Sequence, residues 1–77
     1  MELRVLKYFI KIAEEENMTK AAQKLHVSQP ALSKQMKELE NEIGHLLFVR
    51  NKQRMVLTEK GMLLKKRAES ILMLIRQ

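Results

Sequence analysis

Cysteine is absent from the 77 residues, and glycine occurs only twice, as Gly44 and Gly61. Without thiols the chain cannot form disulfides, thiolate zinc sites or iron–sulfur clusters. Two isolated glycines supply no phosphate-cradling loop, and so short a chain has little room for an enclosed catalytic cleft. We therefore expect one small domain that is not an enzyme, built from helices and stabilised by a partner chain.

Long apolar runs and metal-ligand patterns are also missing. No run approaches the roughly 18 residues of a membrane span. The chain opens with the charged stretch Met1-Glu2-Leu3-Arg4, which no apolar signal segment follows. We expect a cytoplasmic, nucleoid-associated protein. His26 and His45 have no companion ligand at a useful spacing, so we expect neither a metal nor a cofactor. Three aromatic residues are too few for a platform that stacks single-stranded bases.

Positive charge is concentrated in two segments. The chain carries a net charge of +6, yet residues 20–37 hold four lysines and no acid, and residues 50–54 hold three basic residues and no acid. Acidic residues gather elsewhere, as in Glu14-Glu15-Glu16. Such polarity favours a polyanionic partner, nucleic acid ahead of an anionic membrane surface. A merely solubilising lysine face is the alternative.

Apolar spacing predicts two helices in the first third of the chain. Residues 2–16 carry an apolar stripe at helical spacing. Thr19 fits an N-cap for a short helix over residues 20–25, in which Ala21 and Ala22 allow another helix to approach closely. His26 and Val27 then form a turn.

A third helix is predicted from Ser28, its N-cap, to Ile43, with Gly44 as the C-cap. Pro30 lies in the first turn, where a missing N–H costs nothing. The apolar residues at helical spacing predict the inner face: Leu32, Met36, Leu39 and Ile43. The opposite face is polar and basic: Gln29, Ser33, Lys34 and Lys37.

The period then changes. Two short β-prone runs, residues 46–50 and 55–57, flank a polar tip and predict a hairpin. Thr58 can cap a final helix that runs to the C-terminus. That helix ends in five consecutive apolar residues, 71–75, which one small core cannot cover. We expect a second chain to cover them.

A short helix, a tight turn and a longer helix with a polar, basic N-terminal face are typical of a helix-turn-helix, here about residues 19–43. Such a second helix fits the major groove of duplex DNA. The hairpin, about residues 46–57, would place cations beside the duplex. The expected fold is mainly α: a winged helix-turn-helix with a three-helix core, a short β-hairpin wing and a long C-terminal linker helix. We assign the DNA-binding unit to residues 1–58 and the linker and dimerisation helix to residues 59–77.

The segment Ala21-Ala22-Gln23-Lys24-Leu25-His26-Val27-Ser28-Gln29-Pro30-Ala31-Leu32-Ser33-Lys34-Gln35 resembles the N-terminal domain of LysR-type bacterial transcriptional regulators. Further likeness comes from Leu39-Glu40, Leu47-Phe48-Val49-Arg50 and Leu57-Thr58-Glu59-Lys60-Gly61. The resemblance spans nearly the whole sequence. It implies a long linker helix that pairs two DNA-binding domains into a homodimer, an operator with dyad symmetry, and a tetramer in full-length proteins. It also implies a C-terminal domain that binds a small effector. That domain is absent from this sequence, which is either a fragment or a stand-alone domain. We favour a fragment, because the apolar end of the last helix resembles an unfinished interface.

Residues and resemblance together give the expected contacts. In the recognition helix they are Ser28, Gln29, Pro30, Ser33, Lys34 and Lys37. At the DNA backbone they are Thr19, Lys20, Lys24 and Arg50. In the wing they are Lys52, Gln53 and Arg54, although family members commonly carry an arginine at the place of Gln53. For dimerisation they are Leu64, Ala68, Ile71, Leu72, Leu74 and Ile75.

Two other classes of function are compatible with the residues. A protein-interaction module would pair its last helix with a partner and carry an incidental basic face. A membrane-surface helix would combine Lys65, Lys66 and Arg67 with the apolar end.

Overall fold

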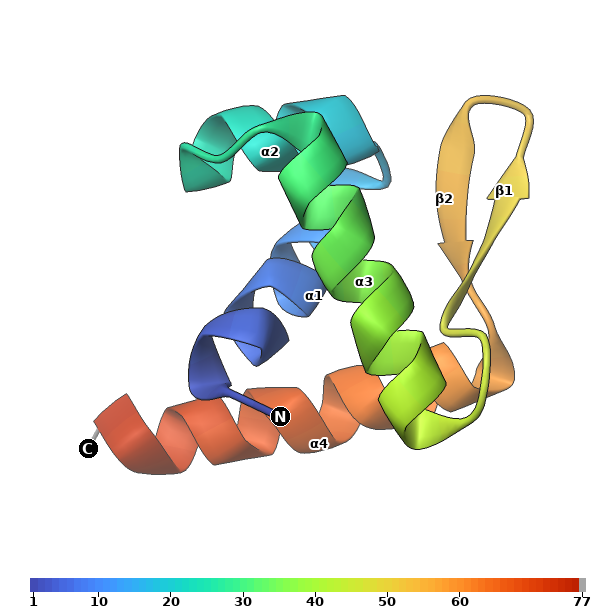
Figure 1. Cartoon of the computed structure of the whole chain (residues 1–77). Coiled ribbons are helices and arrows are strands. Elements are labelled where there is room, and N and C mark those ends of the chain that lie inside the picture. The colour runs from blue at the N-terminus through green and yellow to red at the C-terminus, as the bar shows by residue number, and fades with distance from the viewer. Residues whose placement is uncertain (77) are drawn as a thin grey trace.

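A computed structural model describes residues 1–76, which fold into helices and one hairpin (Figure 1). The elements follow one another as α1 (Leu3–Glu15), α2 (Met18–Leu25), α3 (Gln29–Ile43), β1 (Phe48–Asn51), β2 (Arg54–Leu57) and α4 (Glu59–Arg76). This order is that of a winged helix-turn-helix, as the sequence predicts. No helix among residues 1–76 is both long and apolar enough to cross a bilayer.

The junction between α1 and α2 differs from the prediction. Glu16 ends α1 in the left-handed conformation, with φ of 54°. The predicted N-cap Thr19 is wrong: α2 begins at Met18, and the Asn17 side chain accepts a hydrogen bond from the Lys20 N–H at 2.8 Å. Met18, the first residue of α2, is buried in the core, and this burial favours the earlier start.

Both predicted ends of α3 are confirmed. The Ser28 hydroxyl accepts a hydrogen bond from the Ala31 N–H at 3.2 Å, and Pro30 lies in the first turn. Gly44 closes the helix with φ of 84°, a conformation that glycine adopts without strain. Leu32, Met36 and Leu39 are buried as predicted, whereas Ile43 is only partly buried.

The hairpin is displaced toward its tip relative to the prediction. Asn51 pairs with Arg54 in the antiparallel register, so both residues belong to strands and only Lys52 and Gln53 form the turn. Leu46, predicted to lie in the first strand, precedes it and is exposed. The reason is that backbone pairing continues through polar residues whose side chains face solvent.

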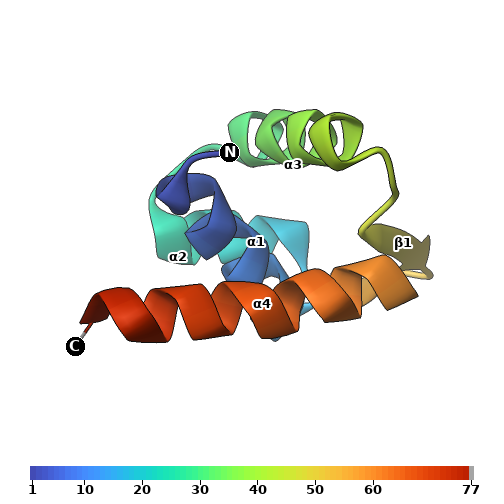
Figure 2. The same ribbon diagram turned by 90° about the horizontal axis from the view of Figure 1, so that it is seen from below.

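One core joins all these elements. Its largest fully buried side chains are Phe9, Ile12, Leu32, Leu39 and Leu47. The ring of Phe9 in α1 lies 5.2 Å from the ring of Phe48 in β1, so the hairpin is packed on the first helix. In Figure 2, α4 crosses in front of α1 and α2 and runs along the opposite side of the core from α3. The helix-turn-helix and α4 therefore face different sides of the molecule.

Candidate nucleic-acid interface

The first three turns of α3 present polar and basic side chains at the surface. Pro30, Lys34 and Lys37 are exposed, and Gln29 and Ser33 are partly buried. Ser28 is exposed too, but its hydroxyl already accepts the capping hydrogen bond. The helix therefore offers amide, hydroxyl and ammonium groups together near its N-terminus.

Exposed polar residues of α2 and the hairpin, most of them basic, extend this surface. Thr19, Lys20 and Lys24 are exposed on α2. The hairpin adds an exposed set: Arg50, Lys52, Gln53 and Arg54. Figure 1 shows α2, the N-terminal end of α3 and the tip of the hairpin at one end of the molecule, with α4 at the other end. We call this end, formed by the residues just named and those of α3, the basic end.

The wing is held against the helices by two glutamates. Glu40 in α3 accepts hydrogen bonds from the Leu47 and Phe48 N–H groups at 2.8 and 3.3 Å. On the other strand, the Met55 N–H donates to the Glu16 carbonyl oxygen at 3.1 Å. The Arg54 guanidinium pairs with the Glu16 carboxylate at 2.8 Å. The position of the hairpin relative to α3 is thus fixed by hydrogen bonds as well as by packing.

The N-terminus of α4 is also fixed to the hairpin. The Thr58 hydroxyl accepts a hydrogen bond from the Gly61 N–H at 3.0 Å, which confirms the predicted cap, and donates one to the Leu46 carbonyl oxygen at 2.7 Å. The Thr58 N–H donates to the Leu47 carbonyl oxygen at 3.0 Å. These hydrogen bonds fix the start of α4 against the residues that lead into the wing.

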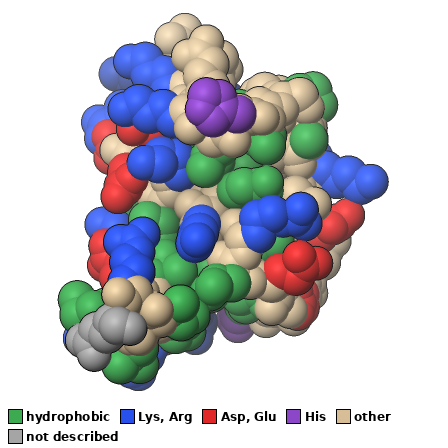
Figure 3. All heavy atoms as spheres, turned by 90° about the vertical axis from the view of Figure 1, so that its left-hand side faces the viewer, with side chains coloured by type: hydrophobic (Ala, Val, Ile, Leu, Met, Phe, Trp, Pro, Cys, Tyr) green, Lys and Arg blue, Asp and Glu red, His purple; other side chains and the backbone are tan. Residues whose placement is uncertain are grey.

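The apolar end of α4 is exposed only in part. Ile71, Leu74 and Ile75 are 43%, 71% and 56% exposed, in accord with the expectation that one core cannot cover this end. In Figure 3, hydrophobic side chains gather around the C-terminal end of the chain. Ala68 and Leu72, which the sequence assigns to dimerisation, are not at the surface: both are buried in the core of the same chain. Leu64 is half-buried against that core.

Sequence reasoning missed three residues here: Leu63, Glu16 and Glu40. Leu63 is 48% exposed and lies eight and eleven residues before Ile71 and Leu74, so it shares their helix face. That spacing was a readable signal. The pair between Glu16 and Arg54 had no signal in the sequence, because it joins residues 38 positions apart. Glu40 lies only seven residues before Leu47, but no helix, strand or turn pattern predicts a hydrogen bond from the Leu47 N–H to its carboxylate.

Metal ligands do not gather anywhere in residues 1–76: no group of three His, Cys, Asp or Glu side chains is placed to hold an ion. The chemistry that this surface offers is recognition of an anion and of hydrogen-bonding edges.

Comparison with known proteins agrees with this chemistry. The sequence model of bacterial regulatory helix-turn-helix proteins of the lysR family matches residues 3–62. The transcriptional regulator BsdA of Bacillus subtilis (strain 168) is 53% identical over 73 residues, which are 94% of this chain and 25% of BsdA. The chain thus spans about a quarter of the length of that relative. The matched family is one of regulators, not of enzymes.

Solved structures give the same answer. A crystal structure of the CbnR DNA-binding domain with DNA superposes with a TM-score of 0.92 at 45% identity, over 97% of this chain and 86% of that one. The BenM DNA-binding domain, crystallised with catB site 1 DNA, gives 0.95 at 40% identity over 100% and 86% of the two chains. The chain therefore belongs to the LysR family of bacterial helix-turn-helix transcriptional regulators and corresponds to their DNA-binding domain.

Proposed function

We propose that this chain binds double-stranded DNA as a homodimer, with the N-terminal half of α3 in the major groove and the wing beside it. The observation that carries the proposal is the basic end: α2, the N-terminal end of α3 and the tip of the hairpin lie at one end of the molecule, away from α4, and each of these elements carries exposed basic residues. An α-helix with its side chains is about 10–12 Å across, which matches the roughly 12 Å width of the major groove.

Gln29, Ser33 and Lys34 are the base-reading residues in this proposal. The Gln29 amide can bind both the N6 and N7 atoms of an adenine, and Lys34 can donate to a guanine edge. Ser33 can donate or accept. Pro30 contributes an apolar surface beside them, and Ser28 acts through the cap that fixes the start of the helix.

The remaining cations would hold the phosphate backbone on both sides of the groove. Thr19, Lys20 and Lys24 lie on α2, whose N-terminus carries partial positive charge from the helix dipole. We also assign Lys37 and Arg50 to phosphate contacts. In the wing, the assigned residues Lys52, Gln53 and Arg54 are exposed, and Lys52 occupies the turn with φ of 58°.

A second copy of the chain is the partner that we assign to the exposed face of α4. Leu63, Ile71, Leu74 and Ile75 form that face, with Leu64 at its border, while Ala68 and Leu72 support it from within. Two identical faces pair about a two-fold axis. Two recognition helices related by this axis require half-sites with dyad symmetry, one or more helical turns apart.

The division of labour follows from this arrangement. We assign residues 1–58 to the DNA-binding unit and α4, from residue 59 onward, to the linker and dimerisation helix; residue 77, also assigned to it from the sequence, lies outside the described residues. In a full-length protein, we propose that a further domain binds a small effector and that dimers join as tetramers. The site of action is the bacterial cytoplasm, where chromosomal DNA lies.

Selection of bound duplexes from a random pool, followed by equilibrium binding across a salt series, tests the proposal. We expect an enriched sequence with dyad symmetry, a complex of two chains per site, and log K that falls with log salt by about 0.9 per phosphate neutralised. A scrambled duplex of equal length is the control. Self-association without DNA binding would instead identify a protein-interaction module, and a salt-independent affinity would contradict the phosphate contacts.

A further inference from the structure

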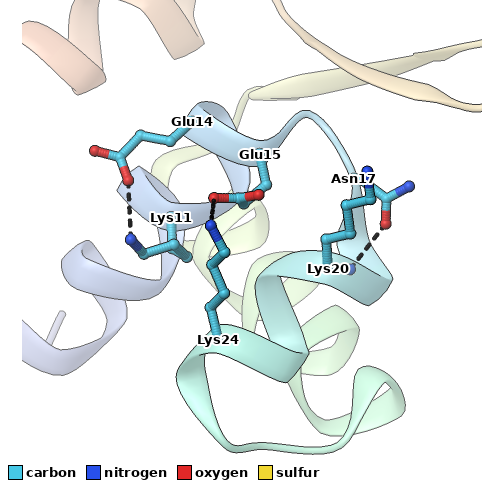
Figure 4. A network of polar contacts seen from close by, with 6 residues as sticks. All are labelled: Lys11, Glu14, Glu15, Asn17, Lys20 and Lys24. Carbon is cyan, nitrogen blue, oxygen red and sulfur yellow. Dashed lines mark hydrogen bonds and ion pairs between the residues drawn. The ribbon is translucent and has the colours of Figure 1, made fainter.

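Three consecutive glutamates end α1, and each holds a cation. The pairs are Lys11–Glu14 at 3.1 Å, Lys24–Glu15 at 2.9 Å and Arg54–Glu16 at 2.8 Å. Figure 4 shows the first two of these pairs side by side at the end of α1. Lys24 and Arg54 are also among the residues that we assign to DNA, whereas Lys11 is not.

We propose that Glu15 and Glu16 compete with DNA phosphates for Lys24 and Arg54, and so lower the affinity of the chain for any duplex. The inference rests on the proposed function. Carboxylate and phosphate oxygens accept charge-assisted hydrogen bonds from the same N–H donors. A phosphate that binds either cation must therefore displace a carboxylate. The free energy of the lost ion pair reduces the binding free energy that the phosphate contact contributes.

The exposures in the Lys24–Glu15 pair favour exchange. The side chain of Glu15 is only 18% exposed, whereas that of Lys24 is 60% exposed. The carboxylate is thus held by the protein while the ammonium lies at the surface on a flexible stem, free to reach a phosphate. An incoming phosphate would move the lysine and leave the glutamate in place.

The Arg54–Glu16 pair is more open, with side chains 65% and 47% exposed. One guanidinium nitrogen, Nη2, contacts Glu16 Oε1. The position of the wing does not depend on this pair, because the Glu16 carbonyl oxygen also accepts a hydrogen bond from the Met55 N–H at 3.1 Å. Replacing the carboxylate by an amide therefore removes the competing charge while the backbone link stays.

The test uses Glu15→Gln and Glu16→Gln, with Glu14→Gln as the matched control. All three remove one negative charge from the same helix end, but only the first two release a cation of the proposed interface. An exposed ion pair contributes about 0.2–1 kcal/mol, equal to about 1.4- to 5-fold in an equilibrium constant. We expect each of the two variants to bind the selected duplex tighter by about that factor, and Glu14→Gln to change affinity less.

A double-mutant cycle separates release of a particular cation from a general change in charge. Lys24→Ala should weaken DNA binding more in the Glu15→Gln background than in the wild type, and Arg54→Ala more in the Glu16→Gln background. Thermal unfolding of every variant checks that the domain remains folded.

The outcomes distinguish this inference from the proposed function. Wild-type protein that fails to bind any duplex would overturn both. Wild-type protein that binds DNA, together with equal affinities for all three glutamine variants or equal losses in both backgrounds of a cycle, would overturn the competition alone. Weaker binding by Glu16→Gln would also overturn it, because the pair would then be positioning Arg54 for DNA.

Discussion

The carboxylate of Glu40 in α3 accepts a hydrogen bond from the backbone N–H of Leu47 at 2.8 Å, at the point where the chain enters the wing. Leu47 is buried, so its N–H needs a hydrogen-bond acceptor within the protein. The same oxygen accepts from the Phe48 N–H at 3.3 Å. One side chain of α3 thus accepts hydrogen bonds from two backbone N–H groups at the start of the wing and fixes the wing relative to that helix.

Glu40→Ala should therefore destabilise the fold. Two backbone donors in a partly buried site lose their acceptor, and leaving such groups unsatisfied costs about 1–3 kcal/mol. Urea denaturation measures the change. Glu38→Ala, on an exposed position of the same helix, is the control and should stay within about 0.5 kcal/mol of the wild type. Equal effects of the two substitutions would contradict the assigned role.

Gly61→Ala should also lower stability. A Cβ atom at Gly61 would overlap the Leu47 carbonyl oxygen and come within 2.9 Å of Leu57 Cδ2. Because a backbone oxygen cannot move aside as a side chain does, α4 would shift away from the wing. Overpacking of this kind costs about 1–3 kcal/mol. A melting temperature at or above that of the wild type would show that the contact between α4 and the wing is looser than described.

The two candidate caps of α2 give opposite expectations. Asn17→Ala removes the acceptor of the Lys20 N–H and should cost about 0.5–2 kcal/mol. Thr19→Ala changes an exposed residue inside the helix and should cost less than about 0.5 kcal/mol. Chemical denaturation of both variants decides between the positions. A larger loss for Thr19→Ala would restore the cap that the sequence predicts.

Leu74→Glu should disrupt the dimer and leave the monomer folded. The side chain is 71% exposed in the single chain, so the charge costs little there, but it would be desolvated against a second copy. We expect the dissociation constant of the dimer, measured by sedimentation, to rise about tenfold or more. Met73→Glu is the matched control, because Met73 is 65% exposed but lines a groove beside Ile10 of α1. Equal weakening by both would place the contact on another face.

Local rules predicted most of the fold. Ser28 and Thr58 predict helix starts because their hydroxyls cap N–H groups three residues ahead, and Gly44 predicts a helix end because it adopts a positive φ without strain. The failures occurred where those rules compete. Asn17 and Thr19 are both good caps, and burial of Met18 favours the earlier start. Glu16 and His26 adopt left-handed conformations that no glycine announces.

The faces of the candidate interface were predictable from the sequence, but not every residue exposed on them. The polar face of α3 follows from helical periodicity, and the apolar excess of α4 follows from composition. Which α4 residues remain exposed does not follow, because Ala68 and Leu72 are buried by contacts that only the tertiary fold creates. The ion pairs of Lys24 and Arg54 with the end of α1 were hidden for the same reason.

Base discrimination by a Gln29 variant is the sharpest test of whether the start of α3 reads base edges. Affinities are measured for the selected duplex, for single-base-pair substitutions of it, and for a scrambled duplex. Gln29→Ala should lose about 1–3 kcal/mol of discrimination at one base pair of each half-site. Lys20→Ala should weaken binding to all duplexes alike. Equal losses by Gln29→Ala on selected and scrambled duplexes would contradict the claim.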